Sequence, residues 1–257
     1  MFLILEVLCI ILLVNNLPYQ KRKLVNVGNA ISGKLFKSKT NFTNYFSLKE
    51  ENQLMMDHNA MLMSKLYINN DNVTLKDSAS SDYRFIPANV INNSLTHVDN
   101  YITIDKGEND GIRPEMGVIN GSGVVGIVYH TSANYSVVIP ILNSKSSVSC
   151  KIKRSDYFGF LKWDGGSSEY ATVKDMPRHS LFSLGDTIVT SGHSAVFPGG
   201  IPIGTVEDMS DSHDGLSYLL KVKLFTDFGR LNDVRVIAQK GLEEQIELEQ
   251  KVKGGRK

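Results

Sequence analysis

The chain has 257 residues, and its 28 Lys and Arg against 27 Asp and Glu give a formal net charge of +1. That length allows one large or two small domains, and the balanced charge gives no sign of the basic face typical of nucleic-acid-binding proteins. Two cysteines, Cys9 and Cys150, are too few for a disulfide framework or a zinc site, so we interpret them as unpaired, small apolar side chains.

The chain opens with an apolar run from Phe2 to Val14 that only Glu6 interrupts. As a helix this run rises about 20 Å, which is short of the roughly 30 Å of a hydrocarbon core. It lacks the basic start and the small-residue cleavage site of a signal peptide. We predict a membrane anchor over residues 1–17 with a truncated, cytoplasmic N-terminus. The basic triplet at 21–23 opposes this orientation, because the positive-inside rule favours basic residues on the cytoplasmic side. A buried core helix is the alternative.

The next predicted element is a helix, and residues 41–70 carry its clearest pattern. Leucine, methionine and asparagine alternate there at spacings of four and three, which is the a/d seam of a heptad repeat. Asparagines at two consecutive a positions favour one register and two strands. We predict a parallel dimeric coiled coil within residues 24–70, with a single amphipathic helix on a globular domain as the alternative. The dimerisation residues are Leu48, Asn52, Met55, Asn59, Leu62 and Leu66.

Residues 71–83 are polar and predict a linker, and the pattern beyond them changes to short β-type runs separated by turn residues such as Asn120-Gly121 and Asp164-Gly165. About a dozen short strands indicate antiparallel sandwiches or barrels. We predict a mainly β fold of two small antiparallel six-stranded β-barrels or sandwiches, over residues 84–165 and 166–240, and then a flexible tail over 241–257. The expected strands are Phe85–Asn92, Tyr101–Asp105, Val118–Ile119, Val124–His130, Val137–Leu142, Val148–Ile152, Tyr157–Trp163, Tyr170–Val173, Thr187–Thr190, Pro202–Val206, Tyr218–Lys223 and Val234–Gln239.

The motifs that would carry chemistry are incomplete. No histidine pair has the i, i+4 spacing of a helical metal site. The run Ser191–Ser194 lacks the G-x-S-x-G elbow of a serine hydrolase. Asp105–Gly111 lacks the ligand register of a calcium loop, and we interpret it as a tight connection with Gly111 at positive φ. Trp163 ends an aromatic run from Tyr157 that we interpret as core or barrel edge. We predict no catalytic residue, no metal site and no cofactor.

The stretch Gly185–Val206 combines two short apolar strands with closely spaced glycines. Glycine at such density indicates positive φ or a close approach of neighbouring backbone. Phe197 precedes Pro198 and is therefore restricted to an extended conformation, so the turn is stiff. We predict a rigid surface here for a partner or for self-assembly. Its residues are Gly192, Phe197, Pro198, Gly199 and Gly200.

Four segments resemble the MreC family of bacterial rod shape-determining proteins: Pro87–Ser94, Asn100–Gly107 with Asp110-Gly111, Gly123–Gly126 and Gly185–Val206. With the anchor and the coil, the resemblance covers nearly the whole chain. It implies a single-pass protein of the bacterial inner membrane whose coil and two β domains lie in the periplasm and which forms a homodimer or a larger assembly. It also implies a non-enzymatic scaffold that organises and activates the peptidoglycan synthases of the cell-wall elongation machinery. The implied partners are MreB, MreD and a class B penicillin-binding protein, with no catalytic residues and no nucleic acid.

Two other classes of protein stay open. A periplasmic adaptor of an export system also joins an anchor, helices and β domains, but it needs two antiparallel helical arms, and one good helix precedes the strands here. A membrane-tethered serine hydrolase on a double barrel would need a base and an orienting third group brought to one of the serines. Covalent labelling of a serine by a fluorophosphonate would favour that second class.

Overall fold

A computed structural model describes residues 2–6, 9, 50–64, 83–155, 157–212, 217–241, 244 and 251. The chain divides into two units, Met1–Met55 and Met56–Lys257, which are described separately. Within those described ranges, no helix combines the length and the apolar character needed to cross a bilayer. Most of the predicted anchor, linker and tail lies outside the described residues, as do Leu48 and Leu66 of the predicted coil, so these remain predictions.

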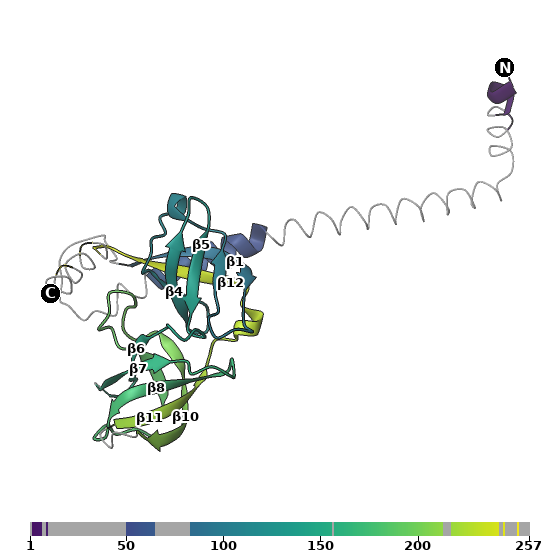
Figure 1. The fold of residues 1–257 in the computed structure, drawn as a ribbon. Helices are drawn as coiled ribbons and strands as arrows, with labels where there is room; N and C mark the ends of the chain where they lie inside the picture. The colour runs from purple at the N-terminus through teal and green to yellow at the C-terminus, as the bar shows by residue number, and fades with distance from the viewer. Residues whose placement is uncertain are drawn as a thin grey trace. The chain divides into compact units, whose positions relative to one another are not determined.

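Twelve strands among the described residues form two closed antiparallel barrels, both in the second unit (Figure 1). The prediction of two small six-stranded antiparallel barrels is therefore confirmed, and each expected strand is present. Most ends shift by one or two residues, but the strands expected over Tyr170–Val173 and Pro202–Val206 continue to Pro177 and Asp211. The first barrel closes in the order β1-β12-β3-β4-β5-β2. Its strands are β1 (Tyr83–Asn93), β2 (Ile102–Ile104), β3 (Gly117–Ile119), β4 (Val124–Thr131), β5 (Ser136–Pro140) and β12 (Asp233–Gln239).

The second barrel closes in the order β10-β11-β8-β7-β6-β9. Its strands are β6 (Val148–Ile152), β7 (Phe158–Lys162), β8 (Tyr170–Pro177), β9 (Thr187–Thr190), β10 (Pro202–Asp211) and β11 (Ser217–Leu224). Because closure pairs every strand with two neighbours, neither barrel presents a free strand edge among the described residues. A partner must therefore be recognised mainly by side chains on the outer faces of the strands and by the loops.

The predicted division at residue 165 is wrong. β6 and β7 precede that point but belong to the second barrel, whereas β12 returns to the first barrel and pairs with β1 from Tyr83↔Gln239 to Asn89↔Asp233. The second barrel is thus an insertion between β5 and β12. Local patterning predicts where strands lie, but it carries no signal for a partner so distant along the chain, and consecutive strands are the default neighbours.

Each barrel is filled by apolar side chains from alternate strand positions, as β6 illustrates. Val148, Cys150 and Ile152 are buried, whereas the intervening residues are partly exposed. The Cys150 thiol is unpaired and fully buried, and this burial raises its pKa to about 12. Cys9 is unpaired and exposed. The interpretation of both cysteines as unpaired is therefore confirmed, and Cys150 acts as a core side chain.

The connection after β2 ends in the short helix η1 (Glu108–Asp110), which Gly111 terminates with a φ of 89°. This confirms the tight connection predicted in place of a calcium loop. The Lys106 ammonium donates a 2.9 Å hydrogen bond to the Asp110 carboxylate, which also accepts from the Gly107 backbone N–H. These two hydrogen bonds hold the pKa of Asp110 below its ordinary value. The ion pair stabilises the turn as long as Asp110 is ionised.

Residues 50–64 form a helix that presents two different faces. Met56 and Ala60 are 6% and 4% exposed, and Ala60 belongs to the same buried cluster as the barrel cores. Met55 and Leu62, from the predicted dimer seam, are 60% and 43% exposed. The face buried within the chain is therefore not the face that carries the predicted seam.

Candidate interaction surfaces

The loop between β9 and β10 is held in place by one threonine. Thr190 is fully buried, and its hydroxyl donates a 2.6 Å hydrogen bond to the Pro198 carbonyl and accepts a 2.9 Å bond from the Ile201 N–H. Gly192 and Gly200 have φ values of 80° and 91°, which favour glycine. The predicted stiff, glycine-dependent turn is present.

The Phe197-Pro198 pair, however, does not form an exposed surface. Phe197 is only 4% exposed and Pro198 is buried. Phe197 packs on Gly117 of the first barrel so closely that a Cβ added there would lie 2.6 Å from the phenylalanine ring. The prediction that these two side chains contact a partner is therefore wrong, because an apolar ring gains more from burial between the barrels than from exposure. The exposed residues of the predicted set are Gly192, Gly199 and Gly200.

Two further contacts join the barrels beside Phe197. Gly123, before β4, approaches the Pro202 carbonyl so closely that no Cβ fits between them. Thr226, on the return from β11 to β12, is 4% exposed and donates a 3.0 Å hydrogen bond to the Val124 carbonyl. The stretch predicted as a contact surface therefore acts in large part as the joint that fixes one barrel against the other.

An exposed aromatic cluster, which we call the aromatic face, lies on the second barrel. Phe158 and Phe160 of β7 are 45% and 38% exposed, with ring centroids 6.1 Å apart. The His193 ring, from the loop after β9, lies 5.3 Å from Phe158, and the Tyr157 and His179 rings meet edge to face at 4.6 Å. Because His193 follows Gly192, the aromatic face continues into the exposed part of the predicted contact stretch.

Sequence reasoning missed the aromatic face because it treated the whole aromatic run as core or edge. That interpretation holds for Trp163, which is 6% exposed and donates its indole N–H to the Ser167 carbonyl. The period of two along β7 would have separated Phe158 and Phe160 from the core, because they share the parity of Lys162, which marks the outward positions. Leu161 occupies the inward parity.

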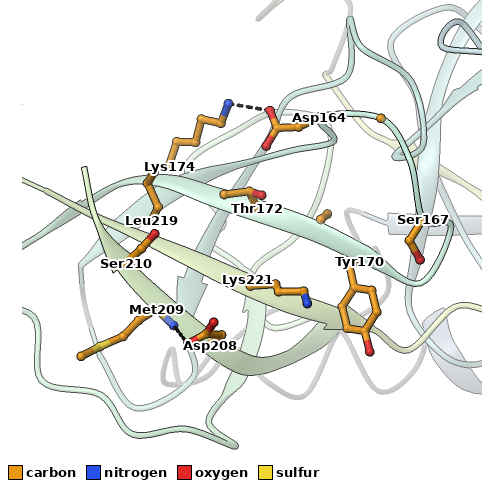
Figure 2. Close-up of a pocket in the computed structure, with 12 residues that line it drawn as sticks. Asp164, Ser167, Tyr170, Thr172, Lys174, Asp208, Met209, Ser210, Leu219 and Lys221 are labelled. Carbon is orange, nitrogen blue, oxygen red and sulfur yellow. Dashed lines mark hydrogen bonds and ion pairs between the residues drawn. The ribbon is translucent and has the colours of Figure 1, made fainter. Parts of the chain in front are cut away.

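A groove of about 710 Å³ lies on the outer face of β8, β10 and β11 (Figure 2). At one edge the Lys174 ammonium donates to the Asp164 carboxylate at 2.6 Å. Elsewhere the Lys221 ammonium lies over the Tyr170 ring, 4.3 Å from its centroid. Burial alone would raise the pKa of Asp164, but hydrogen bonds from Lys174 and Thr172 and the nearby lysine charges together outweigh it and hold that pKa below its ordinary value. The groove therefore combines two fixed charges of each sign with hydroxyl groups and one aromatic ring.

Irregular strand pairing shapes this groove. The β10–β11 register shifts between Val206 and Asp208, and the β11–β8 register shifts between Tyr218 and Leu220. Asp175, in the bulged part of β8, has a φ of 62°, which is unusual for a residue with a side chain. Bulges redirect side chains and are over-represented at functional sites. No pattern in the sequence predicted them.

The serine and histidine residues considered for hydrolysis are not arranged for it. The Ser191 hydroxyl lies 2.7 Å from that of Ser149 and accepts a hydrogen bond from the backbone N–H of His193, whose ring packs at a tilt against Phe158 instead. Across the described residues, no group of three or more His, Cys, Asp or Glu side chains could hold a metal ion. The described chain offers shaped outer surfaces on two closed barrels that contact each other through Phe197 and Gly117, which defines a double β-barrel protein.

The comparisons with known proteins agree with that class. The family model described as "Rod shape-determining protein MreC, barrel core" matches residues 90–238, and the chain belongs to the MreC family. The cell shape-determining protein MreC of Listeria monocytogenes serovar 1/2a is 32% identical over 208 residues, covering 77% of this chain and 69% of that protein. Its counterpart in Bacillus subtilis strain 168 is 26% identical over 219 residues, covering 79% of this chain and 76% of that protein. The family resemblance is confirmed.

Solved structures share the fold. The structure described as MreC of Listeria monocytogenes has 28% identity and a TM-score of 0.58, and covers 86% of this chain and 95% of its own. The crystal structure of MreC from Pseudomonas aeruginosa has 21% identity and a TM-score of 0.55, covering 60% and 99%. A complex between the penicillin-binding protein PBP2 and MreC from Helicobacter pylori matches with 17% identity and a TM-score of 0.51, covering 62% and 99%. The last two likenesses concern the fold alone.

Proposed function

We propose that this chain is a non-enzymatic scaffold of the cell-wall elongation machinery, which organises and activates peptidoglycan synthases and so maintains rod shape. Membership of a shape-determining family supports this role. The observation that carries it to particular residues is the aromatic face, in which Phe158 and Phe160 remain 45% and 38% exposed. Exposed aromatic side chains gathered on one face are typical of protein–protein interfaces.

The partner proposed for the aromatic face is the class B penicillin-binding protein of the elongation machinery. The solved complex of PBP2 with MreC from Helicobacter pylori describes such a pairing for a protein of the same fold. Aromatic side chains carry a large share of the binding energy when a partner covers them. His179 and His193 lie against Tyr157 and Phe158 and would supply hydrogen-bonding groups beside the apolar rings. The rigid barrel joint would hold these groups in one arrangement.

The helix at 50–64 supports a homodimeric stalk in this proposal. Asn52, Met55, Asn59 and Leu62 are exposed, so the predicted seam is available to the same helix of a second copy. We further propose that the chain is a single-pass protein of the inner membrane with its barrels in the periplasm, and that it contacts MreD and MreB. Confinement beside a membrane and pairing of two copies of the chain would both raise the effective concentration of the aromatic face near a membrane-bound synthase.

A double substitution tests the aromatic face. The Phe158→Ala/Phe160→Ala chain should bind the purified class B penicillin-binding protein at least about tenfold more weakly than the natural chain, since truncated aromatic hot spots typically cost that much. Its thermal unfolding should change little because both side chains are more than a third exposed and lie outside the barrel core. The matched control is Tyr129→Ala/Tyr135→Ala on the first barrel, where the two rings are 47% and 52% exposed. Equal loss of binding in both double variants, or no loss in either, would contradict the assignment.

Disulfide trapping tests the stalk. In a Cys9→Ser background, Met55→Cys should form an intermolecular disulfide readily, because d positions face each other in a parallel dimeric coil. Leu54→Cys is the control: this neighbour is 64% exposed but lies off the seam. Equally fast trapping at both positions would mean that the helices collide without a preferred seam.

A further inference from the structure

The groove on β8, β10 and β11 lies beside the aromatic face but is not part of it. Phe160 of the aromatic face pairs across the sheet with Lys174, which lines one edge of the groove. We propose that this groove binds a short, uncharged glycan segment rich in hydroxyl and amide groups. That the glycan would then lie next to a docked synthase rests on the proposed function; the binding itself does not.

The charges of the groove favour a neutral ligand. Lys174 and Lys221 are balanced by Asp164 and Asp208 among the lining residues. Lys174 is already neutralised by Asp164 at 2.6 Å, and the carboxylate of Glu207 lies 3.4 Å from the Tyr170 hydroxyl. A polyanion would find no excess of positive charge and would meet repulsion from the acidic side chains. An uncharged ligand can accept hydrogen bonds from the ammonium groups and donate hydrogen bonds to the carboxylates. Its binding removes no net charge of its own from water.

The uncharged lining matches the two-sided character of a sugar ring. Hydroxyl groups of Ser167, Thr172 and Ser210 are each both donor and acceptor, as sugar hydroxyls are. Tyr170 and Met209 supply apolar surface for the C–H face of the ring, and Tyr170 adds a polar tip. Figure 2 places Tyr170 toward one end and Met209 toward the other, with Thr172 between them, Ser210 near Met209 and Ser167 near Tyr170. The groove volume of about 710 Å³ falls within the range of small-ligand sites.

An extended peptide is a poorer match than a glycan. Peptides commonly bind sheets by adding a strand to a free edge, which supplies backbone hydrogen bonds. β8 is paired with β7 and β11, and β11 with β10 and β8, so the floor of the groove offers no such edge. Recognition here depends on side chains, which suits a ligand whose hydrogen-bonding groups point outward around its rings.

The chain carries a natural reporter for this site. Trp163 is the sole tryptophan, directly precedes Asp164, and donates its indole N–H to the Ser167 carbonyl at 2.9 Å. Asp164 and Ser167 both line the groove, so a ligand that orders their loop will change the surroundings of the indole. Tryptophan emission therefore reports on occupancy without a label.

The experiment is a fluorescence titration of the full chain, in a detergent without sugar groups, with chitotetraose, a neutral oligomer of N-acetylglucosamine. We expect saturable binding that is equal at low and high salt, because no ionic contact drives it. Tyr170→Ala should weaken binding at least about fivefold, which is a modest loss for an aromatic contact. Ser210→Phe provides a second variant, since it blocks the groove from an exposed position of β10 without touching the core. Tyr135→Ala on the first barrel is the control and should bind like the natural chain.

Three results would overturn the proposal: no saturable response to chitotetraose, an affinity in both Tyr170→Ala and Ser210→Phe equal to that of the natural chain, or a signal that citrate reproduces and salt abolishes. The last result would identify an anion site instead. The titration contains no synthase, so a failure of the proposed partner leaves it unaffected. The Phe158→Ala/Phe160→Ala variant should retain glycan binding, which separates the two surfaces.

Discussion

Replacing Phe197 by alanine tests the reassignment of this residue from contact surface to barrel joint. The ring is 4% exposed and packs on Gly117, so its removal leaves a cavity between two rigid barrels that cannot close readily. A buried Phe→Ala change typically costs about 3–5 kcal/mol. In a domain of this size each kcal/mol lowers Tm by roughly 2–4 °C, so the expected decrease is about 6–20 °C.

The measurement is calorimetry of the natural chain, Phe197→Ala and the matched variant Phe158→Ala. Phe158 is 45% exposed, so its truncation should lower Tm by no more than about 4 °C, as expected for a surface position. Since Phe197 joins the barrels, its loss should also broaden or split the unfolding transition. If Phe197→Ala unfolded within about 2 °C of the natural chain, or if Phe158→Ala were the less stable of the two, the burial argument would be refuted.

Three further predictions concern other parts of the barrels. Gly123→Ala should lower Tm strongly because its methyl group would overlap a carbonyl of the second barrel, and calorimetry against a Gly121→Ala control, where open space surrounds the added Cβ, measures this. Cys150, whose thiol pKa burial raises to about 12, should resist iodoacetamide near neutral pH in the folded chain and react after unfolding in urea; equal labelling of the folded and the unfolded chain by mass spectrometry would contradict this. Asp110→Asn should lower the urea unfolding free energy by about 0.5–1 kcal/mol near pH 7. Since Lys106 lowers the folded pKa of Asp110, the contribution is present above the unfolded pKa and should vanish as pH falls through the folded value.

Much of the fold could be predicted because strands leave local signals. The strand at Val148–Ile152, which is β6, and the turn at Gly111 were both predicted from the local sequence pattern, and the structure confirms them. The sequence did not predict which strands pair with each other. β12 pairs with β1 although the whole second barrel lies between them, and the sequence offers no periodicity that links the two.

The candidate surfaces were predicted less well than the strands. The glycines of the β9–β10 loop correctly indicated a constrained turn, yet nothing in the sequence distinguishes a phenylalanine that faces solvent from one that meets another barrel. Phe197 depends on the absence of a side chain at Gly117, which is a long-range match. The groove lies where the register shifts in two ladders, and no local pattern in the sequence marked those shifts.

The return of β12 to the first barrel also determines how the protein would respond to mechanical tension. The chain enters β1 at Tyr83 and leaves β12 at Gln239, and these two residues are direct partners at one end of the same ladder. A pull on the two ends of the barrel region would therefore open that ladder like a zipper, one rung at a time, rather than shear it. The inserted barrel, with its aromatic face, would carry no load until β12 had come free, so the surface presented to partners is insulated from forces transmitted along the chain.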